Sequence, residues 1–268
     1  MDQKTSIKVS LILPTFRRPH LLDLGLHSIS VYKRNFPLEI VVVNDGIEDE
    51  TKNICDKYSS MLDIKYYFSG QRNAQEIKTR CPAWAINIGV KKCSGYIIVL
   101  SCPEVWHLND SLNYIVDPII NMKERIMTTP NTMYYDDKNH MVPILQKNIN
   151  TVITPEMLNS LVVGGKGIPA LRMPFLMGMC KNEFISIGGY DEDFIGYACD
   201  DNDFADRIAG NGVKLLRTPA EIIHLYHTGT NTGLSHADNP AWIYNNTLWR
   251  SRKGIFKRNQ GRDWGMLE

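Results

Sequence analysis

Short strand-like segments alternate with helix-like segments through the first hundred residues, and this alternation constrains the fold more than any other feature. The strand-like runs, mostly apolar and β-branched, cover residues 7–13, 39–43, 64–68 and 96–100. Between them lie stretches of helical character over residues 21–32, 48–58 and 82–92. Strands that are apolar on both faces need helices on both sides, as in mostly parallel sheets. The pattern therefore predicts an α/β fold.

The chain beyond residue 104 keeps a looser form of this pattern. The expected elements are a helix over 111–123, a strand over 125–129, an irregular stretch over 134–169, and late strands over 214–217 and 222–226.

Polar residues follow three of the predicted strands, in segments 14–18, 44–46 and 101–104. Ligand sites in open parallel sheets lie beyond the carboxyl ends of the strands, so these segments predict a nucleotide-type crevice. No Gly-x-Gly-x-x-Gly follows the first strand, which argues against a dinucleotide site. The glycines at 164–167 lack the spacing of a phosphate-binding P-loop.

An acidic turn and two later histidines form the second chemical feature. Asp200 and Asp201 precede a helix expected over 202–209, Asp203 lies in its first turn, and His224 and His227 follow. Carboxylates and imidazoles can hold a divalent ion and remove a proton from a hydroxyl. The alternative is an ordinary helix start, with the carboxylates as caps and dipole partners and Asp203 paired on the surface with the residue four positions later.

Composition narrows the class of protein. The net charge of +1 argues against a dedicated nucleic-acid surface and leaves a local basic patch open. No apolar run approaches the roughly 20 residues of a membrane-spanning helix, and residues 1–6 do not read as a signal peptide. The six cysteines are scattered without Cys-x-x-Cys, as in reduced cytosolic proteins. We therefore expect a cytoplasmic protein.

Specific segments resemble known enzymes. Residues 9–18, 39–46 and 80–89 resemble glycosyltransferase family 2, and residues 188–203 with His227 resemble the C-terminal part of galactosyltransferases. The resemblance implies a GT-A fold, a mostly parallel nucleotide-binding sheet flanked by helices with a smaller acceptor-side portion. It implies a single catalytic domain over 1–268, composed of a nucleotide-sugar half (1–104), an acceptor half (105–228) and a basic helical tail (229–268).

The implied activity is inverting, metal-dependent transfer of a sugar, of the hexosyltransferase type, from a UDP-sugar to a hydroxyl of a glycan or other acceptor. Asp201 would be the catalytic base and Asp200 would orient the acceptor. Glu104 and His227 would ligate Mn²⁺ or Mg²⁺, with His224 as the alternative ligand. Asp45 would bind the donor base, most often uracil. The full implied donor-binding set is Pro14, Thr15, Arg17, Asp45, Arg80 and Asn87.

Departures from the family patterns keep other functions open. The family's Asp-x-Asp metal motif reads Cys102-Pro103-Glu104 here, so the first carboxylate is missing. Tyr197 replaces the usual Trp and Asp200 the usual Glu. One alternative is a non-catalytic protein that binds sugar nucleotides or carbohydrates. Another is a sugar transferase acting on nucleic acid, because basic residues gather over 250–262, although such a run is ordinarily a solvated tail.

Overall fold

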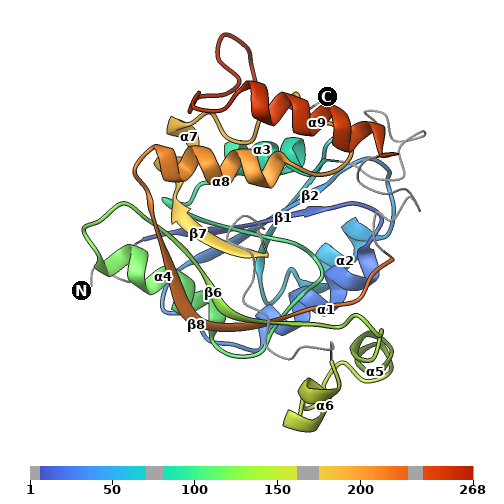
Figure 1. The fold of residues 1–268 in the computed structure, drawn as a ribbon. Coiled ribbons are helices and arrows are strands. Elements are labelled where there is room, and N and C mark those ends of the chain that lie inside the picture. The colour runs from blue at the N-terminus through green and yellow to red at the C-terminus, as the bar shows by residue number, and fades with distance from the viewer. Residues whose placement is uncertain (1–6, 71–80, 162–174, 229–237, 268) are drawn as a thin grey trace.

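The computed structural model describes residues 7–70, 81–161, 175–228 and 238–267. Within these residues one sheet has the strand order β3-β2-β1-β4-β7-β6-β8-β5 (Figure 1). The strands are β1 (Val9–Thr15), β2 (Leu38–Asn44), β3 (Asp63–Phe68), β4 (Ile97–Ser101), β5 (Val105–His107), β6 (Ile126–Tyr135), β7 (Leu176–Cys180) and β8 (Lys214–His224).

The first four strands run parallel, as the sequence predicts. β1 pairs with β2 and β4, and β2 pairs with β3. Thr15 is level with Asn44, and Asn44 with Phe68. The polar segments that follow β1, β2 and β4 therefore leave the sheet at the same edge.

The second half of the sheet mixes directions. β7 is antiparallel to β4 and β6, β6 is parallel to β8, and β5 is antiparallel to β8. The prediction of two late strands is wrong, because β8 is continuous through Pro219. Its pairing with β6 shifts register between Pro130 and Thr132, and such an irregularity accommodates residues that cannot donate to the ladder.

Helices cover both faces of the sheet (Figure 1). The core on one face includes residues of α1, α2 and α4, and the core on the other face includes residues of α3, α7 and α8, with α9 packed against it. The helices are α1 (Pro19–Ser30), α2 (Thr51–Tyr58), α3 (Ala83–Lys92), α4 (Ser111–Asn121), α5 (Met141–Lys147), α6 (Pro155–Ser160), α7 (Lys181–Ser186), α8 (Asp200–Gly210) and α9 (Pro240–Ser251).

The stretch 134–169 is more ordered than expected in its described part, since it contains α5 and α6. A third hydrophobic cluster holds them, in which Met141 and Leu145 pack with Trp106 and Ile223. Distant strands thus supply the apolar partners that these short helices need, because a helix of six or seven residues has little stability of its own. No helix in the described ranges is both long and apolar enough to cross a bilayer.

Candidate active site

The carboxyl ends of β1, β2 and β3 meet around Asp45. The backbone amide of Asp45 donates to the Thr15 carbonyl at 2.8 Å, and its buried carboxylate accepts a hydrogen bond from the Ser69 hydroxyl. The Thr15 hydroxyl is buried and has no hydrogen-bond partner within the described part of the chain. Thr15 and Asp45, both predicted to bind the donor, therefore lie side by side with polar groups at the expected edge.

The other predicted donor residues are placed differently. Pro14 lies within β1 opposite Val43 and is half-buried. Arg17 is exposed, adopts a positive φ of 56° and lies over the Phe16 ring. Arg80 lies outside the described residues.

Asn87 is committed to a structural contact. Its side-chain amide donates to the Tyr190 carbonyl and to Glu192 Oε1, each at 2.9 Å, and accepts from the Tyr190 amide. The residue is fully buried in α3. This geometry gives the predicted donor contact no support, because the side-chain amide of Asn87 is already hydrogen-bonded to the loop before α8.

Glu104 and the two histidines come together across more than one hundred residues. Glu104 Oε1 lies 3.4 Å from His227 Nε2 and 3.8 Å from His224 Nε2. The pairing of β5 with β8 causes this, since Val105 is opposite His224 and the Leu225 amide donates to the Glu104 carbonyl. One atom from each of the three residues falls within 4.8 Å of the others, a spacing that suits a metal ion.

Electrostatics favour the ligand form of this cluster. Burial alone would raise the pKa of Glu104, but the hydrogen bond from His227 and the charge of Arg18 hold that pKa at about 2. Burial lowers the pKa of His224 to about 4. At neutral pH the carboxylate is therefore ionised and the His224 imidazole is neutral, as metal ligands must be.

Two buried atoms of the cluster lack partners. Glu104 Oε2 and His227 Nδ1 are buried and make no hydrogen bond to any described residue. Leaving such atoms unsatisfied costs stability. Together with the oxygen and nitrogen donor set, they fit a divalent cation such as Mn²⁺ or Mg²⁺.

The acidic pair opens α8, which begins at Asp200 rather than at the expected residue 202. Ala198 and Cys199 precede it with φ of 73° and 70°. Two successive non-glycine residues in the left-handed region are strained, and such strain concentrates at functional sites. The bend turns Asp200 and Asp201 into the first turn of the helix.

Burial raises the pKa values of both carboxyl groups, and the charge of Asp200 raises that of Asp201 further. Asp200 accepts a hydrogen bond from the Cys81 thiol at 3.3 Å, and Asp201 Oδ1 accepts one from the Tyr190 hydroxyl at 3.1 Å. Carboxyl groups with raised pKa values suit proton transfer near neutral pH.

Cys102 follows the end of β4, directly before Pro103 and Glu104. Burial raises the pKa of its thiol, and the charges of Glu104 and Asp201 each raise it further.

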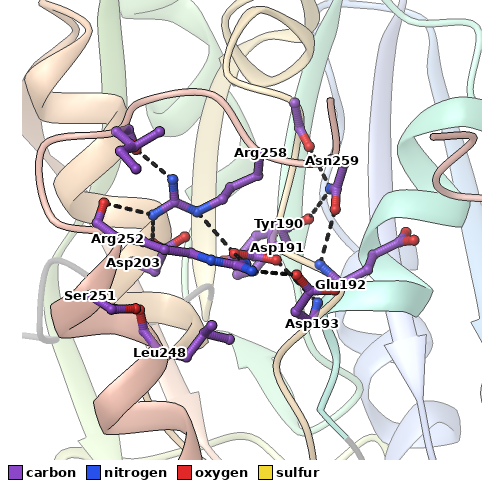
Figure 2. Close-up of polar contacts among 12 residues, drawn as sticks. Tyr190, Asp191, Glu192, Asp193, Asp203, Leu248, Ser251, Arg252, Arg258 and Asn259 are labelled. Carbon is purple, nitrogen blue, oxygen red and sulfur yellow. Dashed lines mark hydrogen bonds and ion pairs between the residues drawn. The ribbon is translucent and has the colours of Figure 1, made fainter. Parts of the chain in front are cut away.

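Arginines from the C-terminal segment hold the loop that carries Tyr190 (Figure 2). Arg258 contacts Asp203 Oδ1 at 2.6 Å and Asp191 Oδ2 at 2.9 Å, and Arg252 contacts Asp191 and Asp193. We call this group the arginine latch; it consists of Arg252, Arg258, Asn259 and Arg262 with Asp191, Asp193 and Asp203. The solvated tail expected over 250–262 is thus wrong for Arg258, whose side chain is buried against Asp191 and Asp203, whereas Arg252 and Arg262 pair while partly exposed to solvent.

Sequence reasoning missed the latch, and the only signal for it was the matching of acidic residues before α8 with basic residues after α9. The surface pair expected between Asp203 and Arg207 is also wrong. The two do pair at 2.6 Å, but both side chains are 2% exposed. Phe204 and the latch cover this part of α8, so the pair is part of the core.

Comparison with known sequences identifies relatives of this chain. The model of the family described as glycosyltransferase like family 2 matches residues 18–235. A chondroitin synthase of Pasteurella multocida is 26% identical over 77% of this chain, and one of Escherichia coli is 21% identical over 76%. The chain spans 23% and 32% of the lengths of these two proteins.

Solved structures with similar folds are glycosyltransferases. GalNAc-T7 with UDP, GalNAc and Mn²⁺ has a TM-score of 0.62 and 17% identity, and the match covers 93% of this chain and 50% of that one. Staphylococcus aureus TarS with UDP has a TM-score of 0.56 and 16% identity, covering 93% and 67%. These matches confirm the predicted GT-A fold. The likeness of residues 188–203 to galactosyltransferases stays a prediction.

Proposed function

The chain belongs to the glycosyltransferase-like family 2, and we propose that it transfers a sugar from a UDP-sugar to an acceptor hydroxyl with inversion at the anomeric carbon. The observation that carries the proposal is the contact of Glu104 Oε1 with His227 Nε2 at 3.4 Å, beside His224 Nε2 at 3.8 Å. An ionised carboxylate, imidazoles and a proton-accepting carboxyl at the edge of a nucleotide-binding sheet match the needs of this reaction.

Asp201 is the proposed base. It takes the proton of the acceptor hydroxyl while the hydroxyl oxygen forms a bond to the anomeric carbon. The bond from that carbon to the diphosphate oxygen breaks, and UDP leaves with the electron pair. Tyr190 fixes the orientation of the Asp201 carboxylate through its hydroxyl, and Asp200, one residue away and buried, raises the proton affinity of the pair.

Glu104, His227 and His224 are the proposed holders of the divalent cation, and bound there it would stabilise the negative charge of the leaving diphosphate. Thr15 and Asp45 are the proposed contacts to the nucleoside, supported by their burial at adjacent strand ends. Two solved neighbours contain Mn²⁺ with UDP or with GDP-mannose, so guanine nucleotides belong among the competitors in any binding test.

The acceptor is proposed to be a glycan. The names of the curated relatives, chondroitin synthase and hyaluronan synthase, support this proposal. Oligosaccharides of chondroitin and hyaluronan are therefore the first acceptors to screen.

The test combines binding and turnover. Isothermal titration with UDP, GDP and ADP in the presence of Mn²⁺ should show selective binding of UDP. Incubation with UDP-sugars and acceptor oligosaccharides should release UDP, and proton NMR of the product should show the anomeric configuration opposite to that of the donor. Selective binding without turnover would favour a non-catalytic sugar-nucleotide-binding protein. Equal or absent binding of all three nucleotides would refute the donor site.

A further inference from the structure

We propose that Arg18 is an exchangeable counter-cation of this site: it neutralises Glu104 before the divalent cation binds and moves to the donor diphosphate afterwards. The inference rests on the proposed function, because that function requires both a divalent cation and a nucleoside diphosphate. It assigns Arg18 two alternative partners in the site, the Glu104 carboxylate and the diphosphate.

The position of Arg18 supports the first half of the proposal. Its Nη1 donates to Glu104 Oε1 at 2.7 Å. The same oxygen is approached by His227 Nε2 at 3.4 Å and by His224 Nε2 at 3.8 Å. A cation ligated by this oxygen and the imidazoles would meet the guanidinium at close range, so the two positive charges compete for one carboxylate oxygen.

The burial of Glu104 explains why a counter-cation is needed. The residue is 4% exposed, and an ionised carboxylate without a partner is costly in such surroundings. A guanidinium stays charged at every physiological pH. Arg18 therefore keeps the cluster folded and ionised while no metal is bound.

The surroundings of Arg18 support the second half. It lies three residues beyond Thr15, the last residue of β1, and directly before α1. The buried Thr15 hydroxyl makes no hydrogen bond to any described residue. The Arg18 side chain is 25% exposed and is thus able to move toward solvent. A planar guanidinium can donate two parallel hydrogen bonds to a phosphate. Once displaced from Glu104, Arg18 would gain a new anionic partner in the diphosphate.

One substitution should therefore change two affinities in opposite directions. For Arg18→Ala we expect Mn²⁺ to bind about tenfold tighter without nucleotide, because a competing unit charge a few ångströms away has been removed. With Mn²⁺ saturating, we expect UDP to bind about tenfold weaker, because a charge-assisted contact is lost. Mn²⁺ binding is read from the electron paramagnetic resonance signal of free Mn²⁺, and UDP binding from isothermal titration. Arg18→Lys keeps the charge and should leave Mn²⁺ affinity close to that of the unaltered chain.

Arg125→Ala is the matched control. Arg125 also pairs with one glutamate, Glu183, and its carbonyl accepts from the Lys214 amide at the far end of β8. β8 is 11 residues long, so about 30 Å of strand separates this pair from His224. Both affinities should be unchanged in this variant.

The other possible results for the Arg18 variants contradict the proposed exchange. Unchanged or weaker Mn²⁺ binding by Arg18→Ala, or unchanged UDP binding, overturns the exchange. Loss of both affinities together with a lowered melting temperature would show a structural role and also overturns it. If the unaltered chain bound neither Mn²⁺ nor UDP, the proposed function itself would fail, and this result is distinct from a failure of the Arg18 variants.

Discussion

The hydroxyl of Tyr190 donates a hydrogen bond to Asp201 while its ring stacks on Phe204, three residues further along α8, at a centroid distance of 4.3 Å and an interplanar angle of 2°. The tyrosine is fully buried. Its ring is therefore fixed by packing, and it fixes in turn the carboxylate that we propose as the base.

Replacement of Asp201 by Asn tests that role. The amide keeps the size of the side chain but cannot take up a proton near neutral pH, so turnover should fall by ~10²–10⁴ while UDP affinity stays near that of the unaltered chain. Steady-state kinetics and isothermal titration measure the two effects. Asp206→Asn, at an exposed position of the same helix, serves as the control with full turnover. A variant with full activity and a melting temperature lowered by a lost cap would make Asp201 a capping residue only.

Removal of the proposed ligands should weaken Mn²⁺ binding in a defined order. Glu104→Gln and His227→Ala should each reduce Mn²⁺ affinity by at least ~10–100-fold, the loss already typical of substitutions behind the ligands. His224→Ala should cost less, because His224 Nε2 is farther from Glu104 and its ring packs edge-on against Phe175 at 4.7 Å. Titration of free Mn²⁺ by paramagnetic resonance measures all three. A larger loss for His224→Ala would exchange the two histidines in the assignment.

The arginine latch should contribute stability through its buried member. Arg258→Gln removes one arginine partner from each of the buried Asp191 and Asp203 carboxylates, which keep Arg252 and Arg207. We expect a loss of about 1–3 kcal/mol in the free energy of unfolding. Arg262→Gln removes a side chain that is 39% exposed, and the loss should stay below about 1 kcal/mol. Urea denaturation of both variants measures the difference. Similar small losses would mean that solvent screens the whole latch.

The buried carboxylate of Glu39 should make the free energy of unfolding depend on pH. Burial acts to raise its pKa, but hydrogen bonds from Lys65, Ser10 and Ser94 outweigh burial and hold the pKa of Glu39 well below its usual range. The unfolded value is about 4.3. The lower folded value means that the ionised group stabilises the protein fully above about pH 4–5. This stability is lost as the pH falls below about 4 toward the lowered pKa of Glu39 in the folded protein.

Glu39→Gln should therefore lower stability at pH 7 by about 1–3 kcal/mol, the cost of unsatisfied buried partners, and should flatten the decline in stability below about pH 4. Urea midpoints measured between pH 3 and pH 7 record both effects. Asp56→Asn removes a carboxylate from an exposed pair with Lys52 and should leave the profile unchanged. If stability fell as steeply below about pH 4 in Glu39→Gln as in the unaltered chain, other carboxylates would be responsible for the loss of stability in acid.

The sequence was sufficient to predict the parallel half of the sheet, because each strand there carries its own apolar pattern and a polar residue at its end. Glu104 and His227 were predicted to share a site through their likeness to family motifs, and β5–β8 pairing brings them together. The latch was missed, since acidic and basic stretches in a sequence do not indicate which residues pair, and Asp203 pairs with a residue 55 positions away. The helices α5 and α6 were missed because distant residues such as Trp106 supply their packing.

The separation of Asp203 from Arg258 also has a consequence for biosynthesis. At about 5–20 residues per second, Arg258 is added roughly 3–11 seconds after Asp203. Through that interval the nascent chain carries the acidic loop without its arginines. We therefore expect the loop that carries the proposed catalytic carboxylates to mature only after Arg258 has been made, well after the parallel strands.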